Sequence, residues 1–273
     1  MADSSTPRAI KWASLPNSLE LPYVEQGDES GSPVVFLHAY ADSWRSFEPV
    51  LNHLPRSIHA FAPTQRGHSN AGRPAAGYNV EDFAHDLEAF MDVVGLEQAV
   101  LVASSSATFT VQRLAIDNPH RTRGLVLIGV PWSLRDTAVG SELPQAVFAL
   151  SDPVDPAFVR DFVASTVFGP VSPAFLETVI GESLKVPASV WQATLEGLLA
   201  AIPPTETGTL AAPTLIVWGD RDALVPRVDQ EKLAAAIPDS RLVIYENAGH
   251  VVHWEQPERV AADIVAFVER LAW

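Results

Sequence analysis

The sequence predicts an α/β fold, with a mostly parallel central sheet flanked by helices and a helical cap inserted between two of its strands. Short apolar runs alternate with longer amphipathic ones along most of the 273 residues, as in successive βαβ units. The apolar runs are nearly continuous, which is typical of parallel strands buried on both faces. Between about residues 132 and 209 this alternation ends, and helical patterns with several prolines take its place.

The strands are expected wherever a short apolar run stands between polar or turn-forming residues. The first two segments are expected to form an antiparallel pair, and the later ones to be parallel. In chain order the expected strands are residues 11–15, 19–24, 34–37, 58–62, 99–103, 125–130, 214–218 and 242–245.

Helices are expected in the intervals between these strands. Residues 80–94 carry apolar side chains at helical spacing and stop at Gly95. Residues 106–118 form a second helical segment, which ends before Pro119. The final helix is marked by Ile264, Phe267, Val268 and Leu271.

The domain division follows from the interrupted rhythm. Residues 1–131 and 210–273 are expected to form the core domain, and residues 132–209 the helical cap. Ordinary crossover helices remain an alternative for the cap, although the segment is long for a simple crossover.

Composition restricts the partners and the chemistry. The formal net charge of −15 disfavours nucleic acid and anionic membrane surfaces. The absence of cysteine excludes disulfides, thiolate catalysis and cysteine-based zinc sites. The segment Met1–Lys11 lacks a signal-like apolar run, and no stretch approaches the roughly 20 apolar residues that span a bilayer, so a cytoplasmic protein is expected.

The segment 99–108 predicts a strand, a very tight turn and the start of a helix, which is the context of a serine nucleophile elbow. The close backbone approach in such a turn requires small residues two before and two after the nucleophile. Ser105 has Ala103 and Ala107 at these positions and stands directly after the strand. The sequence therefore favours Ser105 as the nucleophile.

Two neighbouring serines are weaker candidates. Ser104 would place the bulky Val102 at a small position, and Ser106 would place Thr108 there. A polar loop with a serine helix cap is the non-catalytic alternative for the whole turn.

Several landmarks in the same order resemble the α/β-hydrolase fold superfamily, in particular serine esterases and lactonases with a helical cap. The resemblance extends from Pro33 to Trp273 and is weakest in the cap. Residues 38–44 resemble the family's HG…DSW loop, residues 62–68 resemble APDQRGHG, and residues 117–119 stand where the helix after the elbow ends in DHP. The resemblance implies an α/β-hydrolase fold and a Ser-acid-His order of catalytic residues.

The resemblance implies that Asp222 is the acid, because residues 219–222 match the family's GDxD loop, in which the last aspartate is the acid. Asp220 is the competing carboxylate. Some relatives place the acid after the preceding core strand, but residues 129–132 hold no carboxylate here.

The segment 247–257 resembles the family's AGHxxHxExP motif, in which the first histidine is the base. This implies His250 as the base and leaves His253 to a packing or capping role. The remaining histidines are expected at surface or structural positions. No metal-ligand spacing occurs, so neither a metal nor a cofactor is expected.

The oxyanion hole is expected to use the backbone N–H of Ser106 and, by resemblance, that of Tyr40. Ala39, Ala107 and Thr108 stand where the family usually has glycine. Glycine reaches backbone angles that alanine resists, so these positions mark a less typical subfamily.

A serine nucleophile implies acyl chemistry and excludes the aspartate-based chemistry of dehalogenase and epoxide-hydrolase relatives. Hydrolysis of a carboxylic ester or lactone is the leading prediction. Hydrolysis of a carbon–carbon bond in a diketone-type substrate, amide hydrolysis, and ligand sensing with slow hydrolysis are the alternatives.

The substrate is expected to be a small, neutral, apolar or aromatic molecule, and a homodimer is left open. Core packing is an equal alternative for any single residue proposed to line the pocket. The residues expected to line the pocket are His38, Ala39, Trp132, Phe148, Phe162, Trp191 and Val225.

Overall fold

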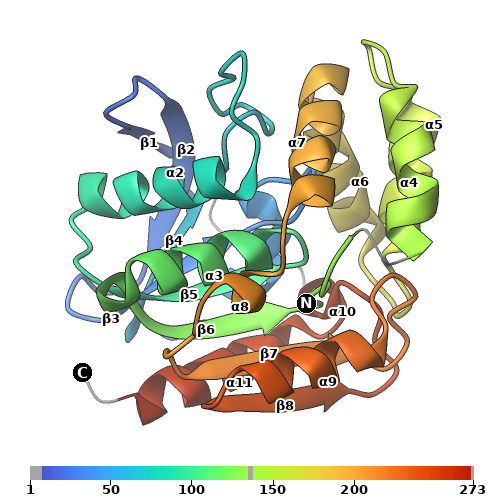
Figure 1. Cartoon of the computed structure of the whole chain (residues 1–273). Helices are drawn as coiled ribbons and strands as arrows, with labels where there is room; N and C mark the ends of the chain where they lie inside the picture. The colour runs from blue at the N-terminus through green and yellow to red at the C-terminus, as the bar shows by residue number, and fades with distance from the viewer. Residues whose placement is uncertain (1–7, 135–137, 272–273) are drawn as a thin grey trace.

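The computed structural model describes residues 8–134 and 138–271, and the side chains of residues 138–142 are not described. The first part of the polar segment Met1–Lys11, like Trp273, therefore lies outside the described residues. The described part contains an eight-stranded sheet in the order β1-β2-β4-β3-β5-β6-β7-β8 (Figure 1). β1, β2 and β4 pair antiparallel, and the remaining pairs are parallel.

Every predicted strand occurs, with bounds that differ by a few residues. The mostly parallel sheet with flanking helices confirms the predicted fold class. The strands are β1 (Lys11–Ser14), β2 (Glu20–Gln26), β3 (Ser32–Leu37), β4 (Ile58–Pro63), β5 (Ala99–Ser104), β6 (Thr122–Ile128), β7 (Thr214–Gly219) and β8 (Ser240–Tyr245).

Helices cover both faces of the sheet (Figure 1). The core helices are η1 (Trp44–Phe47), α1 (Glu48–Leu51), α2 (Val80–Val93), α3 (Ala107–Asp117), η2 (Pro119–Arg121), α9 (Arg227–Ala236), α10 (Val252–Glu255) and α11 (Pro257–Arg270). Along β5, Leu101 and Ala103 face the layer of α2, α3 and α9, whereas Val100 and Val102 face that of α1 and α11. This alternation explains the unbroken apolar runs, because both faces of each strand are buried.

Between β6 and β7 the described residues form helices joined by loops, and no strand. They are α4 (Ala138–Phe148), α5 (Pro156–Ser165), α6 (Pro173–Ser183), α7 (Ala188–Ala200) and α8 (Pro204–Thr207). A separate apolar cluster joins α4–α7 to Tyr78, Val251 and Trp254 of the core. The cap of residues 132–209 stays a prediction as a domain boundary, but this cluster shows how its helices are attached to the core.

Within residues 8–134 and 138–271, no helix has both the length and the apolarity needed to span a bilayer.

A buried ion pair joins the loop after β4 to α2. Arg66 binds Asp86 through both carboxylate oxygens, at 2.5 and 2.6 Å. The two residues are 7% and 5% exposed, and Arg66 also donates to the carbonyl of Gly77. A bidentate pair of this kind fixes the orientation of both partners.

We expect Asp86→Ala to lower the free energy of unfolding by about 3–5 kcal/mol, because it leaves the Arg66 charge buried without its partner. The matched control is Asp117→Ala, which removes the partner of Arg113 on the exposed side of α3 and should cost about 0–1 kcal/mol. Urea unfolding of both variants measures the difference, and equal losses would contradict the structural role of the buried pair.

Candidate active site

Ser105 occupies the turn between β5 and α3 with a left-handed backbone, at φ +50°. A residue that carries a side chain rarely adopts this backbone conformation. The turn is held by a hydrogen bond from Ser105 N to the carbonyl of Ile128, at 2.8 Å. The N–H of Thr108 donates to the Ser105 carbonyl at 3.0 Å, and the Thr108 hydroxyl donates to the same oxygen.

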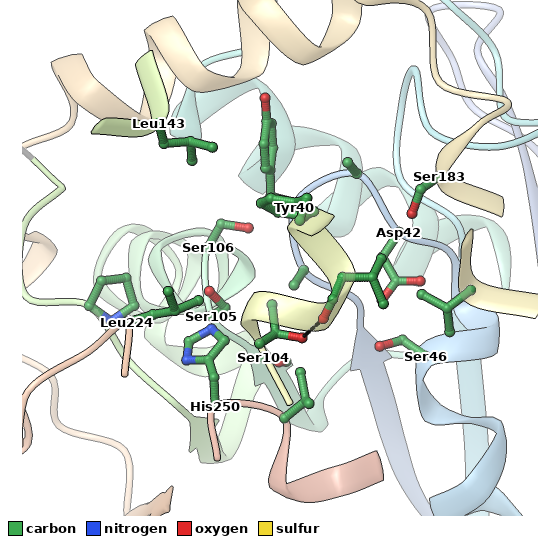
Figure 2. Close-up of a pocket in the computed structure, with 18 of the residues that line it drawn as sticks. Tyr40, Asp42, Ser46, Ser104, Ser105, Ser106, Leu143, Ser183, Leu224 and His250 are labelled. Atoms are coloured by element: carbon green, nitrogen blue, oxygen red, sulfur yellow. Dashed lines mark hydrogen bonds between the residues drawn. The ribbon is translucent and has the colours of Figure 1, made fainter. Parts of the chain in front are cut away.

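The two neighbouring serines differ from Ser105 in backbone and surroundings. Ser104 is the last residue of β5 and is fully buried, and Ser106 has helical angles, with φ −55°. Figure 2 shows the Ser105 hydroxyl beside the His250 ring. The geometry therefore supports Ser105 as the nucleophile at the elbow.

His250 and Asp222 meet at the carboxyl ends of β8 and β7. His250 Nδ1 lies 2.8 Å from Asp222 Oδ2, and the Asp222 side chain is fully buried. The other carboxylate oxygen accepts the N–H groups of Leu224 and Val225, both at 2.9 Å. Asp222 is therefore fixed by its own turn and orients the imidazole through Nδ1, which leaves Nε2 for the serine.

The competing acid and base point elsewhere. Asp220 is exposed, and its carboxylate lies 3.8 Å from Arg221. His253 is fully buried and shares a 3.1 Å hydrogen bond with the Ser46 hydroxyl. Burial, with a contribution from His250, lowers the pKa of His253 to about 3, so it is neutral at physiological pH.

The loop of His250 lies against two glycines at the ends of β6 and β7. A Cβ on Gly219 would lie 2.3 Å from the carbonyls of Ala248 and Gly249. A Cβ on Gly129, which has φ +59°, would lie 3.1 Å from the ring and carbonyl of His250. Gly129 therefore lies directly against the imidazole of His250.

Cap residues also hold this loop. His250 N donates to the carbonyl of Thr166, at 3.1 Å. The Glu255 carboxylate accepts the N–H of Gly249 with one oxygen and the N–H of Phe168 with the other, both at 2.8 Å. Sequence reasoning missed this bridge, since Glu255 appears only as one letter of a family motif.

The backbone N–H groups of Tyr40 and Ser106 are suitable for an oxyanion. Within the described residues neither N–H has a hydrogen-bond acceptor, and both residues line the pocket that contains Ser105. The left-handed residue of the first loop is Ala41, at φ +56°, rather than Ala39. The substitution of glycine by Ala39 is therefore tolerated without strain at that position.

His38 supports this loop from behind. Its Nδ1 lies 2.8 Å from the carbonyl of Ala39, and its Nε2 accepts the N–H of Gln65 at 2.9 Å. Burial and the neighbouring His68 lower the pKa of His38 well below its usual value, so the ring stays neutral. His68 is likewise fully buried.

The pocket beside Ser105 lies between the sheet and the cap (Figure 2). Of the seven residues expected to line it, Ala39 and Phe162 do so. The expectation was wrong for the other five, because tertiary packing turns them away. His38 and Val225 are buried outside the pocket lining, Trp191 packs against Tyr40, Trp132 packs against the apolar cluster that includes α9, and Phe148 is 48% exposed.

Sequence reasoning missed most of the cap residues at this pocket. Leu134, Leu143, Val163, Val179, Leu195 and Leu198 come from α4–α7 and the preceding loop, and Leu224 comes from the turn of the acid. Their apolar spacing marks helices but gives no information on which face meets the core.

No group of three or more His, Asp or Glu side chains in the described chain has an arrangement suited to a metal ion.

We expect Gly129→Ala to lower kcat by about tenfold or more, because the new methyl group displaces the imidazole and a small misplacement of a catalytic group is costly. Steady-state kinetics on an ester substrate measures the loss. The matched control is Gly181→Ala in α6, where a Cβ meets nothing within 4 Å. Equal kcat values for the two variants would show that His250 does not depend on this contact.

Comparisons with known proteins identify the family to which the chain belongs. The model of the alpha/beta hydrolase family matches residues 34–263. A 2-hydroxy-6-oxononadienedioate/2-hydroxy-6-oxononatrienedioate hydrolase from Comamonas testosteroni is 28% identical over 205 residues, covering 67% of this chain and 68% of the relative. Haloalkane dehalogenase 2 from Mycobacterium bovis is 26% identical over 264 residues, covering 89% of each chain.

Among solved structures, an esterase from Rhodococcus sp. ECU1013 superimposes with a TM-score of 0.85 at 24% identity, covering 96% of this chain and 99% of its own. This likeness concerns the fold. Because the family model spans most of the sequence, the chain belongs to the alpha/beta hydrolase family.

Proposed function

We propose that the chain is a serine hydrolase that cleaves a carboxylic ester or lactone through an acyl-enzyme on Ser105. The observation that carries the proposal is the arrangement at the carboxyl ends of β5, β7 and β8. A serine in a left-handed turn lies beside a histidine whose other ring nitrogen is bound to a buried aspartate (Figure 2). A serine hydroxyl requires such a base to act as a nucleophile at neutral pH.

In the first half of the reaction, His250 Nε2 takes the proton of Ser105 Oγ, which attacks the ester carbonyl. The oxyanion that forms accepts the backbone N–H groups of Tyr40 and Ser106. Each such donor typically contributes about 10²–10³ in rate. His250 then passes its proton to the alcohol oxygen, which leaves as the acyl-enzyme forms.

In the second half, water takes the place of the alcohol. His250 removes a proton from the water, hydroxide adds to the acyl carbon, and Ser105 leaves with the proton that His250 returns. Asp222 keeps the Nδ1–H tautomer of His250 in the neutral state and stabilises the imidazolium in between.

Haloalkane dehalogenation does not fit this site, because the residue at the elbow is a serine. Carbon–carbon hydrolysis is a second candidate, and the Comamonas testosteroni relative favours it. It would use the same triad on a ketone carbonyl.

The test is hydrolysis of p-nitrophenyl esters of increasing acyl length by the wild type and Ser105→Ala. We expect the wild type to turn over and Ser105→Ala to lose about 10³-fold or more in kcat. Ser57→Ala, on the exposed loop before β4, is the matched control and should retain wild-type kcat.

Three outcomes would contradict the proposal or part of it. Equal rates for wild type and Ser105→Ala would remove Ser105 from the mechanism. Loss of activity in Ser106→Ala instead would move the nucleophile by one residue. Turnover of a vinylogous diketone without turnover of any ester would replace ester hydrolysis by carbon–carbon hydrolysis.

A further inference from the structure

One side of the pocket is polar, although most of the lining is apolar. Asp42, Ser46, Ser183 and His253 all line the pocket, and we call these four residues the distal polar wall. Figure 2 shows Asp42, Ser46 and Ser183 on the side of the pocket away from His250. The four residues are between 0% and 4% exposed. Burying polar groups without hydrogen-bond partners is costly, so these side chains are expected to bond to one another or to a bound molecule.

The hydrogen bonds within the wall determine which atoms remain for a ligand. Ser46 Oγ accepts the Trp254 Nε1–H at 3.1 Å and lies 3.1 Å from His253 Nε2. The Ser46 hydroxyl also lies near the Asp42 carboxylate and lowers the pKa of Asp42. A hydroxyl has one proton, so if it goes to Asp42, His253 must donate from Nε2. This tautomer leaves His253 Nδ1 as an acceptor.

Two buried polar atoms of the pocket residues have no partner in the described chain. They are His253 Nδ1 and the hydroxyl oxygen of Ser104, and both residues are fully buried. Most buried side-chain polar atoms in proteins are hydrogen-bonded. These two atoms therefore leave hydrogen bonds that a molecule bound in this pocket can make.

The charges around Asp42 favour a particular kind of ligand. One carboxylate oxygen accepts the Ser43 N–H at 2.7 Å. Burial, with a smaller contribution from Glu182, raises the pKa of Asp42 to about 7, and no cation is among the groups that shift it. The nearby Arg45 binds Glu48 at 2.8 Å. Burial already disfavours the negative charge of Asp42, so a ligand carboxylate beside it would add to that cost, whereas a hydrogen-bond donor would stabilise the ionised form.

We propose that the distal polar wall binds a neutral hydroxyl group carried by the substrate away from its scissile bond, so that the enzyme prefers hydroxylated esters. This inference rests on the proposed ester hydrolysis. A hydroxyl donates to the Asp42 carboxylate and accepts from the Ser104 or Ser183 hydroxyl. An ammonium group would lose its hydration in a largely apolar pocket with a single carboxylate to replace it.

The test compares ethyl ω-hydroxyalkanoates of increasing length with alkanoates in which a methyl group replaces the hydroxyl. Acid release is followed by pH-stat. We expect kcat/KM at one chain length to favour the hydroxylated ester by about tenfold or more, because an unfilled polar subsite rejects a substrate that lacks the hydroxyl. The effect should lie mainly in KM.

Asp42→Asn should lower this preference ratio by about tenfold, since it replaces the free acceptor by a donor while its amide oxygen still accepts the Ser43 N–H. The matched control is Asp28→Asn, at a surface side chain that is 45% exposed and pairs with Arg56 away from the pocket lining, which removes the same charge and should keep the ratio. Ser183→Ala, which should also lower the ratio, serves if Asp42→Asn does not fold.

The outcomes separate the subsite from the proposed function. Hydrolysis of both series without preference would overturn the subsite alone. Preference for ω-amino over ω-hydroxy esters would overturn the assignment of a neutral hydroxyl. If neither series nor the p-nitrophenyl esters were hydrolysed, the proposed function would fall, and the subsite with it.

Discussion

The left-handed backbone of Ser105 is the constraint around which the site is built. A residue with a side chain in this region costs about 1–3 kcal/mol, and such strain persists only when the surrounding structure holds it. Here β6 accepts the N–H of Ser105 through Ile128, and Thr108 donates twice to its carbonyl. The left-handed turn places the Ser105 hydroxyl beyond the carboxyl end of β5, next to the loops that follow β3, β7 and β8.

The other parts of the site depend on close backbone contacts at the same edge. Gly219 lets the loop of His250 lie against β7, and Gly129 leaves room beneath the imidazole. His38 holds the loop of Tyr40 without titrating, because burial keeps it neutral. The cap then secures the histidine loop through Thr166 and through Phe168, which shares the Glu255 carboxylate with Gly249. The chemistry belongs to the core, while the cap supplies the rest of the pocket wall.

The fold and the arrangement at the elbow could be predicted because their signals are local. Each strand is a short apolar run, and the acid and the base stand in loops directly after such runs. The pocket could not be predicted in this way. Phe162 and Trp191 are both aromatic residues within apolar helical segments, yet Phe162 lines the pocket and Trp191 packs behind it. Which of the two reaches the pocket depends on how α5 and α7 pack against Tyr40. The polar wall was missed for the same reason, because Asp42 and Ser183 are about 140 residues apart in sequence.

The central claim is that Ser105, and neither of its serine neighbours, is acylated during turnover. Its most direct measurement is peptide-level mass spectrometry after reaction of the intact protein with a fluorophosphonate. We expect a single stoichiometric phosphonyl adduct on Ser105, which forms far more slowly in His250→Ala because the serine then lacks its base. An adduct on Ser104 or Ser106, or equal labelling of Ser105 with and without His250, would contradict it.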